Sequence, residues 1–128
     1  MDKENLLPRE VICVLPLRFK TLMDGDVFMF LIMDVATNFV YQADVEKGEG
    51  IENVLTQLKS LMKNKDFNIH KTRPFTLVMT KHEEHRTLIE DIIKPKKGSL
   101  LIDEQYVIQN TAHAANHLLS SIKARRNS

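Results

Sequence analysis

The sequence predicts an α/β fold on one mixed sheet of five strands, three antiparallel and then two parallel, with helices flanking the sheet. Three observations predict this class. Three apolar runs of strand length, separated by turn residues, precede position 46. Apolar residues then recur at helical spacing from Ile51 to Met62. Beyond that helix, short apolar runs alternate with helical stretches, which gives the element order βββαβαβα.

The first two strands are predicted to form a hairpin. The segment 11–19 is rich in β-branched and apolar residues, and Pro16, which lacks an N–H, should mark a bulge, an edge or the end of that strand. Asp24 and Gly25 favour a hairpin turn. The run Val27–Met33 that follows is too uniformly apolar to have a solvent face. We therefore expect two antiparallel strands here.

The second turn leads into a third strand. Asp34 can accept a hydrogen bond from the backbone two residues on, Thr37 lies within the turn, and Asn38 tolerates a positive φ. The chain then reverses into the segment 39–45, which completes a three-stranded antiparallel meander.

The second half of the chain alternates strand and helix. Phe75–Met79 is a short apolar run typical of a buried strand. Thr80 and Glu83 have the spacing of a capping box, so we expect a helix to open there and to stop near Pro95 and Gly98. The apolar face of this helix is expected to bury Leu88, Ile89, Ile92 and Ile93.

A strand at 99–102 and a long helix at 103–124 are expected to complete the chain. The resulting element order is that of the ribonuclease H-like fold. The helix between the third and fourth strands should make a right-handed crossover, which places the fourth strand beside the first and parallel to it. We expect residues 1–128 to form a single domain, because their number and their apolar fraction of 43% suit one hydrophobic core.

The second hairpin resembles that of the retroviral-type integrase and DDE transposase catalytic core. In that family an apolar run is followed by an Asp, two further residues, a Ser or Thr, a turn residue and an aromatic or aliphatic pair. The matching residues here are Asp34, Thr37, Asn38, Phe39 and Val40. The likeness is strongest over 27–62 and extends more weakly to Lys123, and it implies a ribonuclease H-like fold.

The resemblance also implies a chemistry that this sequence lacks. The family uses three carboxylates from three elements to hold two divalent metals. The expected positions fall at Pro16 or Leu17 in the first strand, at Lys81 after the fourth strand, and at His113 in the last helix. Because none of these residues is acidic, we expect a catalytically degenerate relative. Asp34 is interpreted as a residue that holds the turn.

The histidines suggest an alternative chemistry. His82 and His85 are three apart, and His113 and His117 are four apart, so each pair lies on one helical face. If the end of the fourth strand approaches the last helix, Lys81, His82 and His113 line one pocket. Neither pair forms a known zinc motif, and this favours ordinary solvated histidines over a metal site.

Composition restricts the partners. Lys and Arg number 18 against 17 Asp and Glu, so nucleic acid binding would need a local patch. Lys94, Lys96 and Lys97 form a basic loop that can contact phosphate, although such loops are usually solvated turns. A single cysteine, Cys13, and no apolar run long enough to span a bilayer lead us to expect a cytoplasmic protein.

The functional expectation is therefore an inactive integrase-like or transposase-like domain, a pseudoenzyme descended from a mobile-element DNA integration enzyme. It would act as a binding or assembly module that forms a homodimer or binds another protein, with nucleic acid a weaker partner and no cofactor. The alternative is an enzyme or metal-binding protein with a site rebuilt around Lys81, His82 and His113.

Overall fold

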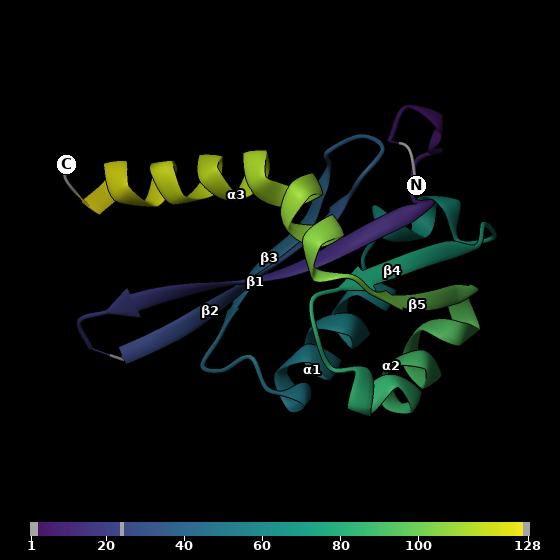
Figure 1. Ribbon diagram of the computed structural model, residues 1–128, viewed down its shortest axis with the longest axis horizontal. Helices are drawn as coiled ribbons and strands as arrows, with labels where there is room; N and C mark the ends of the chain where they lie inside the picture. The colour runs from purple at the N-terminus through teal and green to yellow at the C-terminus, as the bar shows by residue number, and fades with distance from the viewer. Residues whose placement is uncertain (1–2, 24, 127–128) are drawn as a thin grey trace.

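The computed structural model describes residues 3–23 and 25–126, without the side chains of 122–126 (Figure 1). Five strands form one sheet in the order β3-β2-β1-β4-β5, which confirms the predicted mixed sheet. The strands are β1 (Val11–Thr21), β2 (Gly25–Asp34), β3 (Val40–Glu46), β4 (Phe75–Met79) and β5 (Gly98–Ile102). The helices are α1 (Ile51–Met62), α2 (Arg86–Ile93) and α3 (Glu104–Arg126). Short 3-10 turns lie at η1 (Lys3–Asn5), η2 (Phe67–His70), η3 (Glu83–His85) and η4 (Lys94–Lys96).

The pairing of β1 explains how a proline fits inside it. β1 is antiparallel to β2 from Ile12 to Thr21, with Pro16 opposite Phe30. On its other side β1 pairs with β4 in parallel at 11–13, and the registered pairs end there. At Pro16, β1 therefore has no paired strand on the β4 side and is an edge strand there. A residue at an edge does not have to donate an N–H to a neighbouring strand, so proline is tolerated.

The β1–β2 hairpin extends beyond the rest of the sheet, as an arm that Figure 1 shows projecting on the left. Phe30 to Asp34 are buried, whereas Phe28 and Met29 in the outer half are only partly buried. The expectation that this run has no solvent face therefore holds for its inner half, whereas its outer half stays partly exposed, although Phe28 packs against the larger core. Gly25 has φ +68, as a tight turn requires, and Asp24 lies outside the described residues.

Two layers of side chains cover the sheet. α1 and α2 lie on one face and α3 on the other (Figure 1). The larger core packs Ile12, Phe30 and Leu77 of the sheet against α1 and α2. On the other face, a smaller core packs Val11, Cys13, Val35 and Val78 against Val107 of α3. Within the part of the chain that the structure describes, no helix is both long and apolar enough to cross a bilayer.

The predicted capping box at the start of the second helix is wrong. The chain forms the turn η3 first, and α2 begins at Arg86. Both carboxylate oxygens of Glu83 are bonded to Arg86, so this side chain does not return to the Thr80 N–H. The later start also changes the buried face: Ile89 is fully buried, but Leu88 is 49% exposed.

Candidate functional site

Asp34 is a buried carboxylate at the second turn. Its Oδ1 accepts a hydrogen bond from the Arg9 backbone N–H at 3.1 Å, and its Oδ2 accepts one from the Thr37 hydroxyl at 2.6 Å. The bond from the backbone two residues on, expected for Asp34, is made instead by Thr37, whose Oγ1 accepts from the Phe39 N–H at 3.3 Å. Asn38 has φ +63 and donates its N–H to the Asp34 carbonyl at 2.9 Å.

Arg9 is a fully buried residue that the sequence pattern does not single out. Its guanidinium lies 4.1 Å from the ring centre of Phe67 and 4.8 Å from that of Phe75, and Nη1 donates to the Arg73 carbonyl. Burial lowers the pKa of the Arg9 guanidinium. The side chain therefore joins the segment before β1 to the start of β4 through aromatic stacking and one hydrogen bond.

β1, the end of β4 and the start of α3 converge on a cavity of about 220 Å³, which we call the convergence cavity. Lys81 follows β4 and forms an ion pair with Glu49, with 2.5 Å between Nζ and Oε1. The cavity lining consists of Leu15, Pro16, Glu49, Thr80, Lys81, Glu104 and Ile108. The convergence cavity therefore contains two carboxylates and one ammonium group.

Of the positions expected from the resemblance, Pro16 and Lys81 line this cavity, whereas Leu17 and His113 lie elsewhere. Leu17 packs beside the cluster of Leu31 and Met33. His113 is exposed and lines a separate cavity of about 660 Å³ under α3. His113 is nine residues beyond Glu104, about 14 Å along the helix axis, so it cannot reach the end of β4. The expected pocket of Lys81, His82 and His113 is therefore wrong.

The sequence pattern does not single out the two acidic residues that line the convergence cavity, Glu49 and Glu104. Glu104 is the first residue of α3, and β5 ends only two residues earlier. That short connection could have predicted the position of Glu104, because it places the first turn of α3 beside the strand ends. Glu49 precedes α1 in a glycine-flanked loop, and only the tertiary structure brings it to Lys81.

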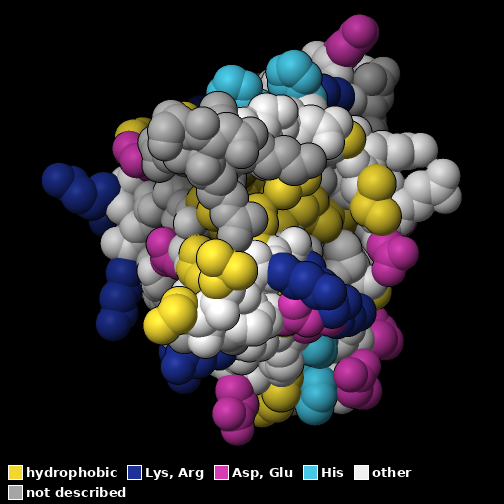
Figure 2. Space-filling model, turned by 90° about the vertical axis from the view of Figure 1, so that its left-hand side faces the viewer, with side chains coloured by type: hydrophobic (Ala, Val, Ile, Leu, Met, Phe, Trp, Pro, Cys, Tyr) yellow, Lys and Arg dark blue, Asp and Glu magenta, His cyan; other side chains and the backbone are white. Residues whose placement is uncertain are grey.

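The histidines form two separate groups, and Figure 2 shows histidine in two places on one face of the molecule. His82 and His85 lie in the connection between β4 and α2, with their ring centres 6.0 Å apart. His113 and His117 both line the larger cavity under α3. The four histidines therefore do not meet in one site.

The basic loop after α2 is largely engaged with its surroundings. Lys96 Nζ donates to Asn68 Oδ1 at 2.9 Å, and Lys97 Nζ donates to the Thr72 carbonyl at 3.0 Å. Lys94 is exposed. A phosphate would have to compete with these protein partners for two of the three ammonium groups.

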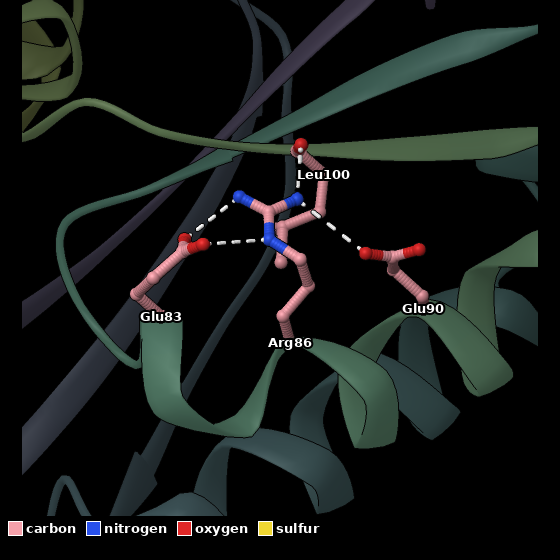
Figure 3. A network of polar contacts seen from close by, with 4 residues as sticks. All are labelled: Glu83, Arg86, Glu90 and Leu100. Carbon is pink, nitrogen blue, oxygen red and sulfur yellow. Dashed lines mark hydrogen bonds and ion pairs between the residues drawn. The ribbon is translucent and has the colours of Figure 1, made fainter.

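A polar network fixes the connection between β4 and α2 (Figure 3). Arg86 Nε and Nη2 donate to the two oxygens of Glu83 at 2.8 and 2.7 Å, and Nη1 donates to the Leu100 carbonyl of β5 at 2.9 Å. Nη1 also lies 3.4 Å from Glu90. These hydrogen bonds lower the pKa of the Glu83 carboxyl and raise that of the Arg86 guanidinium.

Comparison with known proteins identifies the fold. No protein-family model matches the chain, and no curated protein matches it. A solved structure that it resembles is the HTLV-2 integrase catalytic core domain, in a dimeric form in complex with magnesium. The likeness has a TM-score of 0.61 at 12% sequence identity and covers 91% of this chain and 73% of that one. The fold is therefore the ribonuclease H-like fold of integrase cores.

Proposed function

We propose that this chain is a catalytically inactive integrase-core-like domain that acts as an assembly module. The observation that carries the proposal is the Lys81–Glu49 ion pair in the convergence cavity. An integrase-type reaction needs carboxylates from three elements at this point to hold divalent metals. Here β1 contributes Leu15 and Pro16, which carry no metal-binding oxygen in their side chains.

The remaining groups do not suit a pair of hard divalent cations. Magnesium prefers oxygen ligands in near-octahedral geometry. Glu49, one of the two carboxylates in the cavity, is already paired with Lys81. The ammonium group would repel an incoming divalent cation at short range. The groups that line this cavity therefore do not suit the two-metal chemistry of an integrase.

The tip of the β1–β2 arm supports the assembly role. Leu22 is 96% exposed and Met23 is 91% exposed, side by side at the end of a projecting hairpin. Apolar side chains left almost fully in water gain about 1.5–3 kcal/mol each when a partner buries them. We propose a second copy of this chain as that partner, since the integrase core of similar fold was solved as a dimer.

Sedimentation velocity over a concentration series tests this proposal. We expect the wild-type chain to self-associate and the double variant Leu22→Ser, Met23→Ser to associate at least about tenfold more weakly, because two buried apolar contacts are lost. Ile69→Ser is the matched control, since Ile69 is also an exposed apolar residue, at 69%, but lies in η2. A wild-type chain that stays monomeric, or a double variant that associates as tightly as wild type, would refute the assembly role.

A further inference from the structure

We propose that His82, Glu84 and His85 form a binding site for one zinc ion in the connection between β4 and α2. This site is separate from the convergence cavity and does not depend on the assembly role. One ligand atom from each residue can be chosen so that all three atoms lie within 4.8 Å of one another. Glu84 Oε1 is 3.9 Å from His82 Nδ1 and 3.8 Å from His85 Nε2.

The ring of His82 is held in the tautomer that a metal ligand needs. Its Nε2 lies 3.1 Å from the backbone carbonyl of Glu49. A carbonyl only accepts hydrogen bonds, so Nε2 carries the proton and Nδ1 of the neutral ring has a free lone pair. Histidine ligands in metal sites commonly donate their other ring N–H to a backbone carbonyl in this way.

The free nitrogen of His82 has no partner of its own. The side chain is only 11% exposed, and Nδ1 is buried without a hydrogen-bond partner among the described residues. The 3.9 Å to Glu84 is too long for a hydrogen bond. A buried nitrogen without a partner costs free energy, and a metal ion would remove that cost by accepting the lone pair.

The backbone of His82 is also in an uncommon state. Its φ is +84 and its ψ is +31, a left-handed conformation that costs a non-glycine residue about 1–2 kcal/mol. Arg9, Asn38 and Lys97 share this region of backbone conformation, so its role here is to direct the His82 ring inward and not to mark a ligand site by itself. This conformation accompanies a ring that is buried against Glu49 instead of being exposed to solvent.

Glu83 and Glu84 are adjacent in sequence, but only Glu83 belongs to the polar network of Arg86, so only Glu84 is available to bind an ion. Figure 3 shows both oxygens of Glu83 directed at the Arg86 guanidinium. Glu84, by contrast, is 68% exposed, and its carboxylate lies within 4 Å of a ring nitrogen of both histidines. Since Arg86 also bonds to the Leu100 carbonyl, the turn is fixed to β5 before any ion binds.

The donor set indicates zinc instead of magnesium. Two imidazoles and one carboxylate suit borderline divalent ions, whereas magnesium prefers oxygen ligands. Zinc–ligand bonds of about 2.0–2.2 Å at tetrahedral angles separate the ligand atoms by about 3.3 Å. The Glu84 contacts therefore need to close by about 0.5 Å, and the two histidine ligand atoms, which lie within 4.8 Å of each other, by at most about 1.5 Å. Rotation of the exposed Glu84 and the partly exposed His85 side chains supplies this movement. The fourth position would be left to water.

Calorimetric titration of the tag-free chain with zinc chloride tests the site. We expect one ion per chain, and a loss of affinity of about 100-fold or more in Glu84→Gln and in His82→Ala. Glu84→Gln removes an exposed carboxylate and therefore leaves the fold intact. Glu83→Gln is the matched control, because Arg86 engages that carboxylate, and we expect its affinity to stay within about threefold of wild type.

A cobalt titration gives an independent reading, since tetrahedral cobalt(II) has intense visible absorption bands. We expect these bands in wild type and in His113→Ala, and their loss in His85→Ala. Absence of zinc binding would overturn the proposal. It would also be overturned by equal losses in Glu83→Gln and Glu84→Gln, or by binding that disappears in His113→Ala.

Discussion

Replacing Asp34 tests whether this residue stabilises the second turn, because a residue that holds the turn lowers the free energy of unfolding when it is removed. Asp34→Ala leaves the buried Arg9 N–H without an acceptor, which costs about 1–3 kcal/mol. The Thr37 hydroxyl also loses its acceptor, but Thr37 is exposed and water can replace the bond, so this loss is about 0.5–1 kcal/mol. We therefore expect the free energy of unfolding to fall by about 1.5–4 kcal/mol.

Urea unfolding followed by circular dichroism measures this change. Asp34→Asn should retain most of the stability, because the amide oxygen can accept from Arg9 and the Thr37 hydroxyl can turn to accept from the amide nitrogen. Asp44→Ala, a substitution of an exposed aspartate in β3, is the control and should stay within about 0.5 kcal/mol of wild type. If Asp34→Ala is no less stable than Asp44→Ala, the hydrogen bonds of Asp34 do not hold the turn.

Two further perturbations test the packing of the sheet. A Cβ at Gly98 would lie 2.5 Å from Phe75 Cζ and 2.8 Å from Ile93 Cβ, so Gly98→Ala should lose about 1–3 kcal/mol in urea unfolding. Gly50→Ala, where a Cβ meets nothing within 4 Å, should lose less than about 1 kcal/mol, and equal losses would contradict the packing argument. Burial raises the pKa of the Cys13 thiol to about 12, so above pH 9 the unfolded chain releases a proton that the folded chain keeps. Stability should therefore fall as the pH rises from 9 towards 12, by up to about 1.4 kcal/mol per pH unit from this group, and this slope should be shallower in Cys13→Ala. An unchanged slope would mean that Cys13 ionises in the folded chain.

The element order was predictable because each element has a strong local pattern. α1 is an example: its apolar residues repeat at helical spacing, a glycine precedes it, and its observed bounds are the predicted 51–62. The start of α2 was not predictable from the capping signal at Thr80. Arg86 competes for the same Glu83 carboxylate, and it prevails by bonding both oxygens.

The site was less predictable than the fold, because it depends on how far along α3 each residue lies. α3 begins two residues after β5, so its first turn and not its middle reaches the strand ends. The helix pattern does not show which turn of α3 meets the sheet, and His113, about 14 Å along the helix axis from Glu104, lines a different cavity. The burial of Arg9 could not be predicted from the sequence for a related reason. A charged residue is normally expected at the surface, and Arg9 is buried only because the tertiary structure brings Phe67 and Phe75 against its guanidinium.

A metal-dependent cleavage assay tests the central claim most directly, namely that this chain keeps the integrase-core fold without its chemistry. Labelled single- and double-stranded DNA is incubated with the tag-free chain and Mn²⁺. The Lys81–Glu49 pair in the convergence cavity predicts no cleavage above that of a protein-free control. Cleavage that requires Mn²⁺ and disappears in Glu104→Gln would contradict the claim, because it would place a working carboxylate in that cavity.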